Sequence, residues 1–320
     1  MRSDVQATLT VVVPCFNEEA VIPSVITDLH AFAGKLPCKA LFLFVNDGSS
    51  DRTAELLDRA CESDDRIGCI HFSRNFGHQI AVSAGLRHAR GELVAVIDAD
   101  LQDPPSVIAE MIGKWREGYD VVYGVRTNRK EGWLLRMAYA GFYRMLSRLS
   151  NVDLPLDAGD FSLMDRRVVD EINRMPEHNR FVRGLRGWVG YRQIGLPYER
   201  QARQAGKPKY NLRRLFNLAI EGFINFSSVP LRIASWIGAL ASLLGFGLLV
   251  WAIVSSLVLQ RLPPGWASLV VMVLFFGGIQ LLVLGIIGEY IGRIFDEVKN
   301  RPHFVVASQS GWARKDASAP

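Results

Sequence analysis

Oxygen-bearing side chains crowd the end of one apolar run in this chain of 320 residues. In the stretch AVIDADLQDPP (residues 95–105), Asp98, Asp100, Gln102 and Asp103 follow residues that are typical of a buried strand. Because Asp98 and Asp100 stand two apart at the end of that strand, both carboxylates can point into one opening. Such carboxylates suit Mg²⁺ or Mn²⁺, which would bridge the oxygens of a diphosphate. Asp103 precedes two prolines, which indicates a turn or helix-cap residue instead of a ligand.

The acidic cluster is one of four polar clusters that follow apolar, strand-like runs. PCFNEE follows the first run, NDGSSD the second, SRNFGH the third and DADLQD the fourth. Helices are expected between the runs and after the last, near residues 20–32, 51–61, 79–89 and 106–115. Strict alternation of strands and helices predicts an α/β domain whose mainly parallel sheet is covered on both faces. Ligands of such sheets bind at the carboxyl ends of the strands, so we expect the four clusters to line one crevice.

Several classes of protein are disfavoured by what the sequence lacks. It has no GxGxxG, no GxxxxGK[ST] and no GxSxG, which argues against dinucleotide-binding enzymes, P-loop proteins and α/β-hydrolases. Its four cysteines lack zinc-like spacing and its first residues lack a signal-peptide-like apolar region, so a cytosolic domain with reduced thiols is expected. The net charge of +5 permits anionic partners. Because the basic residues cluster beside apolar helices, a bilayer explains them better than nucleic acid does.

Two long runs without charge mark the last third of the chain. No charged residue occurs over 233–260, and after Arg261 none occurs over 262–288. A bilayer core is crossed by about 20 apolar residues, so the runs predict two transmembrane helices within 231–292. Cations precede and follow the pair, which by the positive-inside rule places both flanks on the cytoplasmic side of the membrane. The alternative is a pair of helices buried in a soluble core.

Two basic, aromatic-rich segments precede this hairpin and have the pattern of amphipathic helices. They span about 131–149 and 211–230. Such helices lie in the lipid headgroup layer or pack on a domain core, and their position before an anchor favours the membrane interface. The predicted organisation is an α/β domain over 1–210, an interfacial helix over 211–230, the hairpin over 231–292 and a cytoplasmic tail over 293–320.

These motifs resemble the polyprenyl-phosphate glycosyltransferases of family 2, which have the GT-A fold and include dolichol-phosphate mannose synthase and bactoprenol glucosyltransferases. The resemblance runs through VVVPCFNEE, VNDGSSDRT, SRNFGHQIAVSAGL, VIDADLQDPP, YGVRTNR, DAGDFSLMDRRV, GKPKYNLRRL and GEYIGRIFDEVKNRP. It implies a Rossmann-like, nucleotide-sugar-binding GT-A domain that transfers a hexose to undecaprenyl phosphate or another polyprenyl phosphate. The two-helix hairpin points to the bactoprenol subgroup, so the expected donor is UDP-glucose, with GDP-mannose and other UDP-sugars as alternatives.

The resemblance also implies roles for the matching positions. The nucleotide and donor pocket is expected to include Pro14, Asn17, Glu18, Asp47 and Asp98. The metal ion, Mg²⁺ or Mn²⁺, is expected to be bound directly or through water by Asp98, Asp100 and Gln102. The catalytic residues are expected to be Arg126, Asp157 and Asp160. The diphosphate or the lipid phosphate is expected to contact Arg203, Lys207 and Lys209 in a loop that closes over the site.

Some of these residues have competing structural explanations. Asp160 can simply pair with Arg166 or Arg167, and the two lysines of GKPKY can belong to an ordinary solvated loop. His78 is expected at a strand-to-helix junction rather than as a catalytic base. The residue pattern alone therefore leaves the roles of Asp160 and of the lysines open.

The chemistry of the acceptor sets what the site must do. A phosphate monoester has a second pKa of about 6, so it is largely dianionic at neutral pH and needs no strong general base. In-line displacement would invert the anomeric centre of the sugar, while the metal ion and Arg126 stabilise the departing nucleoside diphosphate. Asp160 is then expected to orient the sugar or the acceptor at least as much as to remove a proton.

Two other functions are considered for the same motifs. A processive polysaccharide synthase would carry a QxxRW-like motif and more membrane helices, whereas LRGWVG lacks the Gln at that spacing. A membrane-tethered nucleotide-sugar sensor or scaffold would not need the DAD triplet, Gln102 and Arg126, which argue against lost catalysis. The aromatic faces of the membrane-proximal helices make a homo-oligomer the expected assembly.

Overall fold

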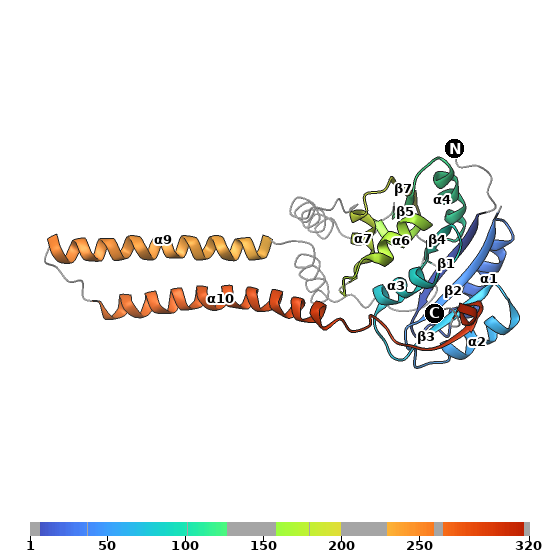
Figure 1. The fold of residues 1–320 in the computed structure, drawn as a ribbon, viewed down its shortest axis with the longest axis horizontal. Coiled ribbons are helices and arrows are strands. Elements are labelled where there is room, and N and C mark those ends of the chain that lie inside the picture. Colours follow the sequence, from blue (N-terminus) through green and yellow to red (C-terminus); the bar gives the residue numbers. More distant parts are fainter. Residues whose placement is uncertain are drawn as a thin grey trace. The chain divides into compact units, whose positions relative to one another are not determined.

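The computed structural model describes residues 7–36, 38–100, 102–126, 158–178, 180–199, 229–258 and 265–316. They belong to two compact units, an α/β unit that includes the residues after 300 and a helical unit that ends at Asn300 (Figure 1). The helix predicted over 131–149 lies outside the described residues, as does nearly all of the helix predicted over 211–230.

Strands and helices alternate along the first part of the α/β unit, as the sequence predicts. The strands are β1 (Thr8–Cys15), β2 (Lys39–Asn46), β3 (Ile67–Phe72), β4 (Leu93–Val96), β5 (Val121–Arg126), β6 (Ala158–Asp165), β7 (Gln193–Tyr198) and β8 (Val306–Gly311). The helices are α1 (Ile22–Ala33), α2 (Thr53–Ser63), α3 (His78–His88), α4 (Ser106–Arg116), α6 (Arg166–Arg174) and α7 (Val182–Trp188). The predicted α/β class is confirmed.

All eight strands form one sheet in the order β7-β5-β6-β4-β1-β2-β3-β8. β1 pairs in parallel with β2 and β4, and β2 pairs in parallel with β3. The carboxyl ends of these four strands therefore lie along one edge of the sheet. β6 runs antiparallel to β4 and β5, and β8 runs antiparallel to β3, so the sheet is mixed rather than wholly parallel.

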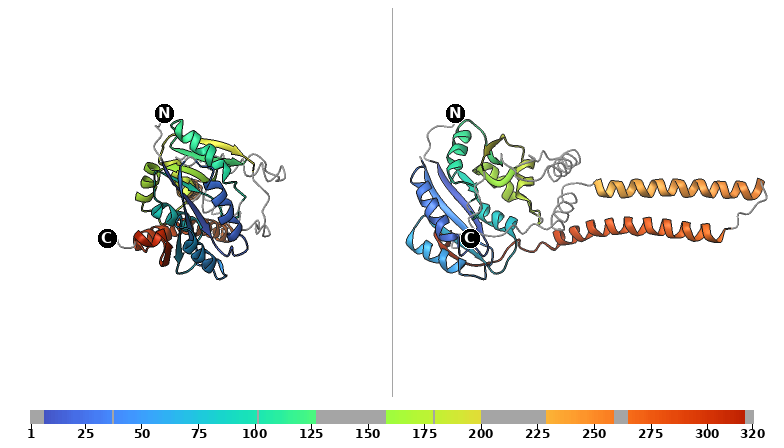
Figure 2. Two further views of the ribbon diagram at one scale, coloured as in Figure 1. Left: turned by 90° about the vertical axis from the view of Figure 1, so that its right-hand side faces the viewer. Right: turned by 180° about the vertical axis from the view of Figure 1, so that it is seen from behind.

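Two apolar layers cover the sheet because successive strand residues point to opposite faces. Val11 and Val13 of β1 belong to a buried cluster with residues of α1, α2 and α4, whereas Val12 belongs to a cluster with residues of α3, α6 and α7. Further views of the fold show helices on either side of the sheet (Figure 2). The central strands are thus buried on both faces, which explains why their sequences are apolar throughout.

Two glycines inside helices test how tightly these layers pack. A Cβ atom on Gly85 of α3 would lie 2.1 Å from Cγ1 of the buried Val12, whereas a Cβ on the exposed Gly113 of α4 would meet no atom within 4 Å. Alanine adds about 1 kcal/mol of helix propensity at either site, but overpacking a core costs about 1–3 kcal/mol. We expect Gly85→Ala to lower the midpoint of thermal unfolding and Gly113→Ala to raise it. A midpoint for Gly85→Ala at or above that of the wild type would contradict this packing.

The residues that follow the helical unit return to the α/β unit as an edge strand. β8 pairs antiparallel with β3, and Trp312 beyond it donates its indole N–H to the carbonyl of Arg66 at 2.9 Å. The Trp312 ring covers Gly68, where a Cβ atom would lie 2.7 Å from it. The Arg90 guanidinium lies 4.9 Å from the centre of the same ring. The tail predicted over 293–320 therefore contains β8, an edge strand that is held by its pairing with β3 and by Trp312.

The helical unit contains two long antiparallel helices, α9 (Val229–Val258) and α10 (Trp266–Lys299) (Figures 1 and 2). Within the described residues, one stretch of α10, Phe275–Lys299, is long and apolar enough to cross a membrane, with a mean hydropathy of 1.6. A shorter apolar stretch, Ala234–Leu248, lies in α9. Large apolar side chains are exposed on both helices, among them Trp236 and Leu281. Exposed apolar surface of this extent indicates membrane association.

Candidate functional site

A pocket of about 320 Å³ opens at the edge of the sheet where β1, β2 and β4 end. It is lined by Pro14, Cys15, Phe16, Glu18, Asp47, Asn75, Gly77, His78, Ala81, Asp98, Ala99 and Asp100. All four polar clusters contribute to this wall. The structure therefore brings together Pro14, Glu18, Asp47, Asp98 and Asp100, which the sequence assigned to one crevice.

The first two pocket loops are joined to each other by hydrogen bonds from backbone N–H groups to side-chain oxygens. Asn17 has a left-handed backbone with φ of 56°, and its side-chain oxygen accepts the Ser50 N–H at 2.8 Å. The Asn17 N–H donates to the Ser49 hydroxyl at 2.9 Å, and the Glu18 N–H donates to the Thr53 hydroxyl at 2.9 Å. Asn17 does not line the pocket and instead holds the loop after β1 against the loop after β2.

The second and third loops are joined through Asp47. Its carboxylate accepts the Phe76 N–H at 2.7 Å and the Gly77 N–H at 2.9 Å, and the residue is 2% exposed. Burial raises the pKa of Asp47 although these two N–H groups act against the rise. Gly48 has φ of +65°, and a Cβ atom there would lie 2.3 Å from the Arg74 backbone. Gly48 therefore lets the two loops approach closely. The predicted contact of Asp47 with a nucleotide base stays a prediction.

Asp98 is a carboxylate of the pocket wall that lies beside His78. Its Oδ1 atom is buried without a hydrogen bond, and its nearest ion-pair partner is Nε2 of His78 at 3.7 Å. Burial raises the pKa of Asp98 to about 6, and neighbouring aspartates add to the rise while His78 opposes it. A buried carboxylate oxygen without a hydrogen bond is the kind of atom that a bound cation would satisfy.

The donor set fits a divalent cation that is shared with a ligand. Among the described residues, no three His, Cys, Asp or Glu side chains lie close enough together to hold a metal ion by themselves. Mg²⁺ is commonly held by one or two carboxylates together with substrate phosphates. Asp98 and Asp100 can supply such a pair. Gln102 lies two residues after Asp100, and its backbone N–H donates to the Asp100 carboxylate at 3.2 Å.

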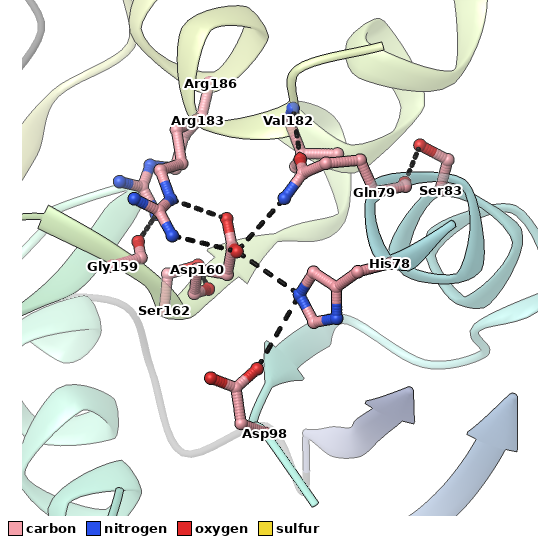
Figure 3. Close-up of polar contacts among 10 residues, drawn as sticks. All are labelled: His78, Gln79, Ser83, Asp98, Gly159, Asp160, Ser162, Val182, Arg183 and Arg186. Atoms are coloured by element: carbon pink, nitrogen blue, oxygen red, sulfur yellow. Dashed lines mark hydrogen bonds and ion pairs between the residues drawn. The ribbon is translucent and has the colours of Figure 1, made fainter. Parts of the chain in front are cut away.

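Asp160 of β6 lies at the centre of a network of charged and polar groups (Figure 3). Arg183 of α7 donates to both of its oxygens, at 2.8 and 3.1 Å, and Gln79 donates to Oδ2 at 3.1 Å. His78 Nε2 lies 3.3 Å from the same Oδ2 atom. Burial alone would raise the pKa of Asp160, but His78 and Arg183 hold it far below its ordinary value. The carboxylate therefore stays ionised and its orientation is fixed.

The alternative pairing considered for Asp160 is wrong. Arg166 donates to the carbonyls of Gly91 and Ala89, and Arg167 contacts Asp165 and Asp120. Both arginines sit at the start of α6, directly after the end of β6 that is remote from Asp160. Arg183, by contrast, contacts Asp160 from α7. The two residues are 23 positions apart, so the local sequence around Asp160 did not indicate this ion pair.

His78 is both the first residue of α3 and a member of the site. Its Nε2 atom lies between Asp98 and Asp160, as the close-up shows (Figure 3). Burial would lower the pKa of His78, but its hydrogen bond to Asp160 and the charges of Asp98 and Asp160 raise it. The two aspartates thus favour the protonated form of an imidazole that lines the pocket. The polar cluster SRNFGH, which ends in His78, placed this residue at the pocket. The predicted junction role explains why His78 begins α3, but not its contacts with Asp98 and Asp160.

Arg126 lies at the end of β5 beside Tyr198, which forms a buried pair with Asp103. Its Nε atom donates to the Tyr198 hydroxyl at 3.3 Å, and that hydroxyl donates to Asp103. Asp103 is fully buried, and the N-terminal cap of α4 is Pro105. The predicted cap role of Asp103 is therefore wrong, because Pro105 caps the helix and the Asp103 side chain accepts from Tyr198 in the interior. A turn role of Asp103 stays a prediction.

The remaining predicted site residues lie outside the part of the chain that the structure describes. They are Asp157, Arg203, Lys207 and Lys209. Their roles stay predictions that come from the resemblance.

Comparisons with known proteins match both parts of the chain. Residues 10–173 match Glycosyl transferase family 2, and residues 229–294 match the GtrB C-terminal hairpin. The chain is 48% identical over 307 residues to the uncharacterized glycosyltransferase YkcC of Bacillus subtilis, covering 96% of this chain and 95% of that protein. It is 41% identical over 299 residues to the SfII prophage-derived bactoprenol glucosyl transferase of Shigella flexneri, covering 93% and 97%.

A solved structure is also similar at the level of the fold. It is glucosyl-3-phosphoglycerate synthase from Mycobacterium tuberculosis in complex with Mn²⁺, UDP and glucosyl-3-phosphoglycerate. The two chains are 20% identical, with a TM-score of 0.44 and coverage of 67% of this chain and 76% of that chain.

Proposed function

Because the chain belongs to glycosyl transferase family 2 and ends in a GtrB-type hairpin, we propose that it transfers a hexose from a nucleotide sugar to polyprenyl phosphate. The observation that carries this proposal is the buried Asp98 oxygen without a hydrogen bond, at the wall of a pocket built from four strand-end clusters. Such a pocket suits a nucleoside diphosphate with its cation. UDP-glucose is the favoured donor because of the similarity to a bactoprenol glucosyl transferase, and GDP-mannose is the alternative.

Asp98 and Asp100, with Gln102, would hold the Mg²⁺ or Mn²⁺ ion. When bound, the ion neutralises charge that develops on the departing diphosphate. Arg126 would contribute positive charge to the same purpose. When protonated, His78 at the beginning of α3 would offer a further positive charge toward an anionic group in the pocket.

Asp160 would act by orientation. Its two oxygens accept from Arg183 and Gln79 and lie beside His78, so the carboxylate is already engaged and strongly acidic. A polyprenyl phosphate is largely dianionic at neutral pH, with a second pKa of about 6, and can attack without losing a proton. We propose that Asp160 fixes His78 and the sugar relative to the acceptor oxygen, and that direct displacement inverts the anomeric centre.

The hairpin would hold the pocket at the plane where the lipid phosphate lies. We propose that both helices cross a bacterial inner membrane, with the α/β unit and both termini in the cytoplasm, because cations flank the pair. Formation of a homo-oligomer is part of the same proposal, and the segments expected to mediate it, 131–149 and 211–230, lie outside the described residues.

A donor screen tests the proposed function. Membranes that contain the chain are incubated with undecaprenyl phosphate and labelled UDP-glucose, UDP-galactose or GDP-mannose, and chloroform extracts are examined by mass spectrometry. We expect one donor to yield a polyprenyl-phosphate hexose that mild acid releases, and membranes without the chain to yield none. A purified, folded protein that forms no such product with any donor would refute the proposal. An Asp100→Ala variant with an unchanged cellular phenotype would instead favour a scaffold.

A further inference from the structure

A continuous chain of hydrogen bonds connects the C-terminal strand with the second pocket loop. The Ser310 hydroxyl of β8 donates to Oδ1 of Asp58 on α2, and Nε2 of His71 on β3 lies 3.2 Å from the same oxygen. Nδ1 of His71 lies 3.0 Å from Nδ2 of Asn46, the last residue of β2. Asn46 Oδ1 then accepts the N–H of Ser49 at 3.1 Å.

This chain has one consistent arrangement of donors and acceptors. An ionised Asp58 only accepts, so His71 must donate from Nε2 and accept at Nδ1. The Asn46 amide group then donates to His71, which leaves its carbonyl oxygen for Ser49. His71 is 5% exposed and Asn46 is 3% exposed, so water does not readily replace a lost partner. The orientation of Asn46 is therefore set from β8, which is separated from β2 by β3 in the sheet.

The polar chain ends at the pocket. The Ser49 hydroxyl accepts the N–H of Asn17, whose neighbours Phe16 and Glu18 both line the pocket. A change in the position of Ser49 would therefore shift the loop after β1 as well as the loop after β2. Neither Ser49 nor any member of the chain from Ser310 to Asn46 lines the pocket itself.

A second, apolar connection runs from the same tail to the third pocket loop. Phe304 stacks on Phe72 at the end of β3, with ring centres 5.0 Å apart and planes 17° apart, and the Val305 carbonyl accepts the Ser73 N–H at 3.0 Å. Phe72 contacts Phe76 edge-on at 5.6 Å. The Phe76 N–H donates to Asp47 of the pocket wall. Residues 304–310 thus support all three loops that follow β1, β2 and β3.

We propose that the C-terminal strand is a positioning element of the donor pocket, with Ser310, Asp58, His71 and Asn46 as positioning residues that set affinity for the nucleotide without touching it. This inference relies on the proposed function only for the identity of the pocket as the donor site. It assigns a role in the reaction to the segment that follows the membrane hairpin. The segment closes the edge of the sheet and also aligns the loops that receive the ligand.

The test compares two serines of the same strand in the full-length protein. Ser310→Ala removes the terminal donor of the chain, whereas Ser308→Ala changes an exposed serine that lies outside it. The Ser310 hydrogen bond is only part-buried and its acceptor Asp58 is 48% exposed, so its loss is expected to raise the Kd for UDP in the presence of Mn²⁺ by about twofold in Ser310→Ala. We expect the KM for the donor to rise in parallel, kcat to stay within about twofold, and Ser310→Thr to restore affinity. His71→Leu interrupts the chain at its centre and should have a larger effect in the same direction.

Amide hydrogen exchange provides a readout that does not depend on turnover. In Ser310→Ala, exchange should become faster in peptides that cover residues 46–51 and 73–77, and in Ser308→Ala it should match the wild type. Unchanged UDP affinity and unchanged exchange in both Ser310→Ala and His71→Leu would overturn the inference, as would equal effects of the Ser310 and Ser308 variants. A wild type that binds UDP and shows these shifts but transfers no sugar would refute the proposed function and leave this inference standing.

Discussion

Asp98→Asn is expected to reduce kcat for sugar transfer by about 10²–10³-fold, because it removes the negative charge that would hold the cation, and the cation would neutralise charge on the departing diphosphate. The substitution keeps the size of the side chain. Asp98 has a buried oxygen without a hydrogen bond, and its pKa is raised to about 6, so the folded protein gains little from its charge. We therefore expect thermal stability to be unchanged or higher while activity is lost. This combination distinguishes a residue kept for function from one kept for folding.

Chelation should reproduce the effect in the wild type. Excess EDTA is expected to abolish product formation, and Mn²⁺ or Mg²⁺ added back should restore it, whereas Asp98→Asn should respond weakly to either ion. Asp170→Asn, at an exposed acid of α6, serves as the control for removal of a carboxylate and should retain full activity. Full turnover after exhaustive chelation, or a fully active Asp98→Asn variant, would exclude the metal-dependent reaction.

The meeting of the four polar clusters at one pocket could be predicted from the sequence, because it follows from the local alternation of apolar runs and helices. Each of the first four strands is a short apolar run, and parallel pairing places the ends of such strands along one edge. The clusters that contain Glu18, Asp47, His78 and Asp98 therefore had to meet once the alternation of strands and helices was recognised. No knowledge of long-range contacts was needed for that step.

The partners of the site residues could not be predicted in the same way. Arg183 reaches Asp160 only because α7 packs near the antiparallel strand β6, and Tyr198 reaches Asp103 from 95 positions away. Arg166 and Arg167 are nearer to Asp160 in sequence than Arg183 is. They nevertheless follow the end of β6 that is remote from Asp160. Sequence proximity was therefore misleading for a carboxylate on a strand, where direction along the strand decides which groups meet.

The C-terminal strand shows a related limit. β8 has the sequence VASQSG, which has little apolar alternation and so no strong strand signal. Its position depends on the free edge of β3 and on Trp312, whose ring fills the space above Gly68. An edge strand of this kind is specified by its tertiary partner, and its contribution to the pocket loops follows from that pairing.

Asp160→Asn is expected to lose both activity and stability, in contrast to Asp98→Asn. Asp160 is 8% exposed and pairs with Arg183 and His78, whose side chains are 34% and 46% exposed, so neutralising it leaves two partly exposed groups without their buried partner. We expect unfolding to become easier by about 1–3 kcal/mol and kcat to fall by about 10²-fold, because His78 is no longer held beside the pocket. The thermal midpoint and the kinetics of the same preparation would measure the two effects.

Asp165→Asn separates the two consequences. Asp165 is on the same strand and is equally buried at 8%, but it accepts from Trp115 at 2.8 Å and caps α6 at the end of β6 away from the pocket. Its replacement should lower stability by a similar amount and leave kcat within about twofold, since the contacts described for it, with Trp115 and Arg167, lie at the end of β6 away from the pocket. If Asp160→Asn behaved like Asp165→Asn, Asp160 would be a structural ion-pair partner and the orientation of substrate would have to come from other residues. A loss of kcat that is confined to Asp160→Asn, at matched loss of stability, would assign the orienting role to Asp160 itself.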